Sequence, residues 1–164
     1  MTAIALVKPT ATNKSLPADN GHRTARRALD QLCQADPRYH SPTRAERTAL
    51  MVAFAARGRT LHPAAFDAIR FEQSVDLTDP AALSANLDAI TICEIKSTNQ
   101  NRIGADLRGY FFNVTAAELL SAQSLGTRYC FVFVNTLTGD HQEMGLNEIF
   151  GRARATYPAW HIRF

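Results

Sequence analysis

The sequence predicts an α/β fold in which a mixed β-sheet is flanked by helices. Two apolar runs, residues 89–97 and 128–135, are rich in β-branched or aromatic residues and predict strands. A helix-like segment with its own start and stop signals separates them, so we expect them to run parallel through a crossover. An alternating segment, residues 66–73, lies close enough in sequence to form an antiparallel partner for the first run.

Length and composition predict one domain with a sizeable core, residues 1–164. The hydrophobic content of 46% and the charged content of 20% are ordinary for a soluble protein, and no run reaches the ~20 apolar residues of a membrane span. A net charge of +3 permits a polyanionic partner without requiring one. The three cysteines are widely spaced and show no disulfide framework, and no secretory leader is evident, so we expect a cytoplasmic protein.

The N-terminal third is expected to add helices to the sheet. Residues 1–21, rich in Thr, Ala, Asn and Pro, predict an irregular arm. Two helices follow over residues 22–36 and 41–58, with Ser41 as the N-cap of the second. Residues 22–58 therefore form an extra N-terminal helical segment.

Residues 59–164 are predicted to form the sheet core. After the strand at 89–97, residues 110–114 predict a short strand, and residues 115–126 predict the crossover helix. Residues 146–158 predict a C-terminal helix, followed by an aromatic tail.

The strand "ITICEIKST", residues 90–98, carries two charges in an apolar setting. Side chains alternate along a strand, so Glu94 and Lys96 point to the same face as Ile90 and Ile92. Charges beside buried aliphatic side chains are costly unless they are paired or hold a ligand. The strand therefore contains either an internal ion pair or a working site.

The expected hairpin brings a further carboxylate to these charges. If Ser74 lies opposite Ala89, the pairing continues inward until Asp67 falls opposite Lys96. Asp67, Glu94 and Lys96 then converge at one end of the hairpin.

Other acidic residues fit this site less well. Asp88 is excluded unless the strand breaks, because six residues of a continuous strand separate it from Glu94 by ~20 Å, too far for a shared cation. Asp76 and Asp79 lie in the loop 75–88 nearer the other end of the hairpin, and they stay open if the strand boundaries differ.

Two segments, "FDAIRFE" and "CEIKST", resemble the Asp…(Asp/Glu)-x-Lys pattern of the PD-(D/E)xK nuclease superfamily, which has the restriction-endonuclease-like fold. The similarity extends from Glu46 in "RAERTALMVAFAARG" to Asn135 and includes "YFFNVTAAEL". Two features depart from the pattern: Ala65-Phe66 replaces the proline before the first Asp, and the segment before residue 40 has no counterpart.

The resemblance implies a metal-dependent phosphodiester hydrolase. Asp67 and Glu94, with the backbone carbonyl of Ile95, would hold Mg²⁺, for which Mn²⁺ can substitute. Lys96 would orient the attacking water or assist its deprotonation, and Glu46 would reach the site directly or through water. The expected activity is that of a DNA endonuclease in restriction, defence or repair.

The polar loop that follows the strand is the candidate nucleic-acid contact. Asn99, Asn101, Arg102 and Arg108 have side chains suited to phosphates or base edges. We expect double-stranded DNA as the partner, and the interpretation allows a homodimer.

Each functional assignment has a simpler alternative. Glu94 and Lys96 form a strand-end ion pair on a solvated edge, Glu46 is a helix-surface charge, and the arginines form a solvated face. Glu118 is explained as half of a Thr-x-x-Glu capping box with Thr115. For the whole chain, the alternative is a non-catalytic nucleic-acid-binding or assembly module that keeps the nuclease fold.

Overall fold

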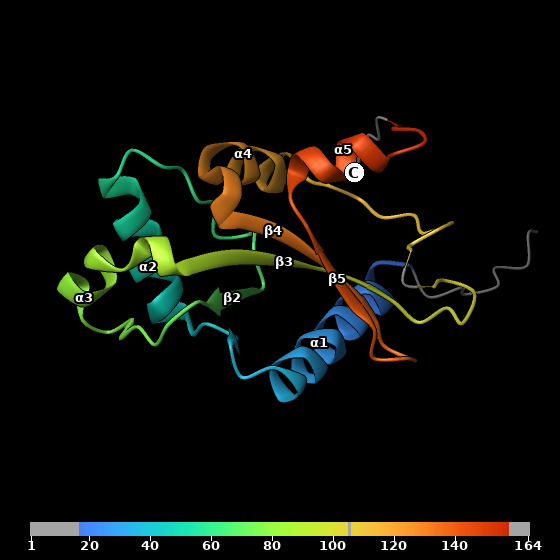
Figure 1. Ribbon diagram of the computed structural model, residues 1–164, viewed down its shortest axis with the longest axis horizontal. Helices are drawn as coiled ribbons and strands as arrows, with labels where there is room; N and C mark the ends of the chain where they lie inside the picture. The colour runs from blue at the N-terminus through green and yellow to red at the C-terminus, as the bar shows by residue number, and fades with distance from the viewer. Residues whose placement is uncertain (1–16, 105, 158–164) are drawn as a thin grey trace, which may run out of the picture.

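The computed structural model describes residues 17–104 and 106–157, with side chains from residue 24 onward (Figure 1). It contains a five-stranded mixed sheet, ordered β1-β2-β3-β4-β5 and flanked by helices, which confirms the α/β class. The strands are β1 (Tyr39–His40), β2 (Ala68–Phe71), β3 (Ile90–Thr98), β4 (Tyr129–Asn135) and β5 (His141–Met144). The helices are α1 (Pro17–Ala35), α2 (Arg44–Ala56), α3 (Pro80–Ala85), α4 (Ala116–Leu125) and α5 (Leu146–Arg152). Short 3₁₀ turns, Leu87–Ala89 and Gly126–Arg128, precede β3 and β4.

The centre of the sheet has the predicted connections. β2 is antiparallel to β3, and β3 is parallel to β4, with α4 in the crossover between them. Every residue of β4 is buried, as expected for a strand covered on both faces. The edge strands β1 and β5 were not predicted, and residues 110–114 form no strand.

The predicted register between β2 and β3 is wrong by two residues. Ala68 pairs with Cys93, which places Asp67 beside Glu94 rather than opposite Lys96. The cause is the connection between the strands, which contains α3 and a 3₁₀ turn instead of an open loop. A shift of two residues leaves the alternation of faces unchanged, so the three charged side chains still share one face.

Helix boundaries differ from the prediction where local capping overrides periodicity. α1 begins at Pro17, five residues inside the expected arm, because proline suits the first turn of a helix. The N-cap of α2 is Thr43 rather than Ser41, since Thr43 and Glu46 form a reciprocal capping box. α5 ends at Arg152, because Ala153 adopts an extended conformation with φ −62° and ψ 127°. The rest of the expected arm and the aromatic tail lie outside the described residues.

The two faces of the sheet bury separate apolar clusters. In Figure 1, α1 lies across one face, while α4 and α5 lie on the opposite side. The α1 face packs Ala28 and Leu32 against strand residues such as Cys93 and Val132. The other face packs apolar residues of the remaining helices against the sheet, among them Leu50, Phe54, Leu83, Ala122, Leu125, Ile149, Ile92 and Phe131. Glu94 and Lys96 point into this second, larger cluster.

The segment leading to α4 packs on the same face. The ring of Phe133 in β4 makes edge-to-face contacts with Phe112, at 4.8 Å between centroids, and with Tyr110, at 5.9 Å. This contact fixes the chain that returns from β3 to α4.

Replacing Phe133, which is 1% exposed, by alanine should lower the free energy of unfolding by about 3–5 kcal/mol, because it leaves a cavity beneath this segment. Urea denaturation measures the loss. Phe111→Ala is the matched control: its ring is 72% exposed, so we expect a change within about 0.5 kcal/mol. Equal losses for the two variants would contradict this packing.

Candidate functional site

Four ionisable side chains meet where β2 begins, on the face covered by α4. Asp67 directly precedes β2, Glu94 and Lys96 lie in β3, and Glu118 lies in the first turn of α4. The site therefore depends on the β2–β3 hairpin and on the crossover helix.

Lys96 occupies the centre of this group. Its Nζ lies 3.0 Å from Oε1 of Glu94 and 2.7 Å from Oε2 of Glu118. The side chain of Lys96 is only 11% exposed, and its ammonium lies 5.8 Å from the ring centroid of Phe131. The ion pair is therefore buried between strand and helix, and the alternative of a pair on a solvated edge is wrong.

Glu94 is the most perturbed carboxyl group of the site. Burial raises its pKa from an ordinary value of 4.5 to about 8, and the nearby carboxylate of Asp67 adds to the rise. The ammonium of Lys96 opposes the shift without cancelling it. With no further cation, a pKa of about 8 therefore keeps Glu94 largely protonated at neutral pH.

The side chain of Asp67 accepts the hydrogen bond that the backbone of a longer β2 would otherwise accept from β3. Its Oδ2 accepts a hydrogen bond of 3.0 Å from the backbone N–H of Ile95, beyond the point where β2 begins. Burial raises the pKa of Asp67, while the bond from Ile95 and the charge of Arg47 act in the opposite direction. A strand residue directs its N–H and its C=O to the same neighbour, so the carbonyl of Ile95 faces the edge where Asp67 lies.

Glu118 was missed as a member of the site. Its Oε2 accepts from the backbone N–H of Thr115 at 3.1 Å, as the capping box predicts, and also from Lys96. The signal was present in the sequence, because a crossover helix returning over β3 brings its first turn to the charged strand. The capping box alone does not explain this carboxylate.

Glu46 bonds to other groups. One carboxylate oxygen accepts from the backbone N–H of Thr43 at 2.6 Å and lies 3.0 Å from Nε2 of His40. Neither bond involves Asp67 or Glu94, so a part for Glu46 in the site stays a prediction.

The alternative acidic residues are bonded to other groups. Asp76 is exposed and accepts from the backbone and hydroxyl of Thr78, and Asp79 caps α3. Asp88 forms an exposed pair with Arg57 at 3.1 Å. Of the four aspartates considered as the first metal ligand, Asp67 is the one that the structure brings to Glu94.

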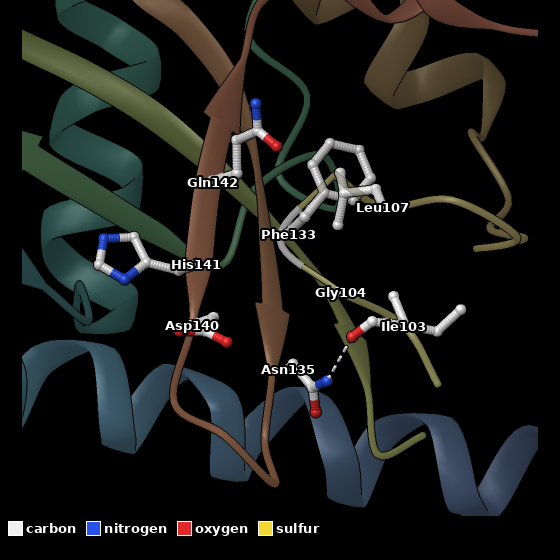
Figure 2. Close-up of a pocket in the computed structure, with 8 residues that line it drawn as sticks. All are labelled: Ile103, Gly104, Leu107, Phe133, Asn135, Asp140, His141 and Gln142. Atoms are coloured by element: carbon white, nitrogen blue, oxygen red, sulfur yellow. Dashed lines mark hydrogen bonds between the residues drawn. The ribbon is translucent and has the colours of Figure 1, made fainter. Parts of the chain in front are cut away.

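The polar loop after β3 is exposed and anchored at its base. Asn99, Asn101, Arg102 and Arg108 are all exposed, and Nε of Arg102 donates to Gln100 at 2.9 Å. Figure 2 shows Asn135 beneath this loop, where its Nδ2 donates to the carbonyl of Ile103 at 3.0 Å. Contact between these loop side chains and nucleic acid stays a prediction.

Comparisons with known proteins give no relative: no family model, no curated protein and no solved structure matches the chain. Within residues 17–104 and 106–157, no three His, Cys, Asp or Glu side chains are grouped as a metal site would group them. Over the same part of the chain, no helix has the length and hydropathy needed to cross a membrane.

Replacing Glu118 by alanine should lower the free energy of unfolding by about 2–4 kcal/mol. The change removes a buried ion-pair partner of Lys96 and half of a capping box. Urea denaturation followed by circular dichroism measures the loss.

Asp88→Ala is the control, because the side chain of Asp88 is 77% exposed in its pair with Arg57. An exposed pair contributes about 0–1 kcal/mol. A loss for Glu118→Ala no greater than that for Asp88→Ala would show that the Lys96–Glu118 pair does not stabilise the protein.

Proposed function

We propose that this protein is a metal-dependent endonuclease with the restriction-endonuclease-like fold, which hydrolyses DNA phosphodiester bonds. The observation that carries the proposal is the group formed by Asp67, Glu94 and Lys96 at the β2–β3 junction, in which Glu94 is buried and the other two are partly buried. Fold alone does not decide function, so it is this group that supports the proposed activity.

The donor atoms at the site suit Mg²⁺. Burial, and after it the nearby carboxylate of Asp67, raises the pKa of Glu94, and a cation between the two groups would replace the proton that Glu94 holds. Mg²⁺ and Mn²⁺ prefer oxygen ligands, and the carbonyl of Ile95 offers a third. When bound, such an ion supplies an acidified water and neutralises charge on the phosphate.

In the proposed reaction, Lys96 holds the attacking water and stabilises the transition state. Its ammonium lies beside Glu94 and is directed there by Glu118, so it can hold the attacking water by a hydrogen bond. The same positive charge stabilises the negative charge that develops on the phosphoryl oxygens.

The DNA-binding surface that we propose is the loop after β3. Arg102 and Arg108 offer positive charge to phosphates, and Asn99 and Asn101 offer amide groups to base edges or the backbone. The loop follows directly from the strand that carries Glu94 and Lys96, so DNA bound to it would pass near the site.

The rival function is a non-catalytic nucleic-acid-binding or assembly module. The observation that favours it is that Lys96 lies between Glu94 and Glu118. Its ammonium therefore already has partners within the protein and needs no substrate to pair with. If the protein is a nuclease, metal binding at Glu94 weakens the contact between Glu94 and Lys96. If it is a non-catalytic module, the contacts of Lys96 with Glu94 and Glu118 only stabilise the fold.

Cleavage of supercoiled plasmid distinguishes the two functions. We expect the wild-type protein to nick plasmid with Mg²⁺ or Mn²⁺ and to be inactive with EDTA. Lys96→Met, which keeps the apolar stem, should reduce the rate by at least ~10²-fold, the usual loss for one electrostatic or acid–base group.

Arg38→Met is the control, because Arg38 is exposed and pairs only locally with Asp36 at 2.6 Å. It should cleave like the wild type, and circular dichroism should show that both variants are folded. If the wild-type protein cuts no DNA with either metal, and Lys96→Met binds DNA as the wild type does, the rival function holds.

A further inference from the structure

Arg47, in the first half of α2, donates hydrogen bonds to the backbone just before β2. Its Nη1 donates to the carbonyl of Phe66 at 2.6 Å, and its Nη2 donates to the carbonyl of Asp67 at 3.1 Å. The planar guanidinium is suited to such a fork, since its nitrogens hold fixed positions relative to each other.

The backbone carbonyls bonded to Arg47 lie outside the hydrogen-bond ladder between β2 and β3. The pairing of β2 with β3 begins at Ala68, and the N–H of Asp67 already donates to the carbonyl of Cys93 at 2.9 Å. Buried carbonyls without a donor are costly, so the fork satisfies groups that the sheet does not reach.

The guanidinium is itself held in place. Its carbon lies 4.4 Å from the ring centroid of Phe66, and that ring is 2% exposed. A cation stacked on a buried ring and bonded to two successive carbonyls has little freedom to move. Helix α2 is thereby bonded to the two peptide units on either side of the Asp67 Cα, from which the carboxylate side chain extends.

We propose that Arg47 is a positioning residue that fixes the Asp67 carboxylate against the edge of β3. The orientation of that carboxylate is visible in its bond to the N–H of Ile95, and rotation of the peptide at Asp67 would break this bond. The consequence for metal binding rests on the proposed function, whereas the effect on the Ile95 bond does not.

The test uses Arg47→Met and Arg47→Lys in the full chain. Methionine removes the bonds to Phe66 and Asp67 and a longer one, 3.5 Å, to the carbonyl of Pro63, and lysine, with a single ammonium, retains at most part of the fork. The control is Arg57→Met at the end of the same helix, where Arg57 donates to the carbonyl of Ser84 and pairs with exposed Asp88.

The first readout is amide hydrogen exchange measured by NMR, without metal. In Arg47→Met, the N–H of Ile95 should exchange about tenfold faster or more, since its acceptor is the Asp67 side chain. The N–H of Thr91, which lies within the β2–β3 ladder, should be unchanged. The exchange rate of the Ile95 N–H in Arg47→Lys should lie between those of Arg47→Met and the wild type, and the rate in Arg57→Met should equal that of the wild type.

The second readout is Mn²⁺ affinity by calorimetry. Loss of a group that orients a metal ligand typically weakens binding by roughly 10–100-fold, so we expect that loss for Arg47→Met and a smaller one for Arg47→Lys. If the wild-type protein binds no Mn²⁺, the proposed function fails, while the exchange experiment still decides the role of Arg47.

Two results would overturn the proposal. The first is unchanged exchange at Ile95 in both variants. The second is equal acceleration at Ile95 and Thr91, which would mean a general loss of stability. Faster exchange at Ile95 alone, with Mn²⁺ affinity equal to that of the wild type, would support the positioning role of Arg47 and contradict its consequence for metal binding.

Discussion

Burial of β3 at the centre of the sheet is the constraint on which the rest of the structure depends. Both neighbours of this strand are paired with it, and helices cover both of its faces. The side chains of Glu94 and Lys96 are therefore each only 11% exposed, and each needs a partner inside the protein. Glu118 from the crossover helix and Asp67 from the chain before β2 are the groups that the fold brings to them.

Burial of β3 also explains why the site holds more carboxyl groups than positive charges. Three carboxylates, those of Asp67, Glu94 and Glu118, face one ammonium, and the structure accommodates them by raising the pKa of Glu94 to about 8. A purely structural ion pair needs only one carboxylate for Lys96. Under the proposed function a cation would balance this surplus of carboxyl groups, and strongly perturbed groups of this kind cluster at functional sites.

The sequence predicted those parts of the fold that local chemistry determines. The apolar runs of β3 and β4 and the capping box of α4 are properties of short segments, so their positions were evident. The edge strand His141–Met144 has no apolar alternation, and β1 has only two residues, so neither gave a signal. The register of the hairpin and the pairing of Glu118 with Lys96 depend on tertiary packing, which no short segment encodes.

The most direct test is the number of protons released when Mn²⁺ binds, measured by calorimetry in buffers of different ionisation enthalpy. A carboxyl group with a pKa of about 8 is protonated at neutral pH and must lose its proton to bind a metal. The account predicts saturable binding with release of about one proton at about pH 7 and much less at about pH 9, with release abolished in Glu94→Gln. Absence of saturable binding, or binding without proton release at either pH, would contradict it.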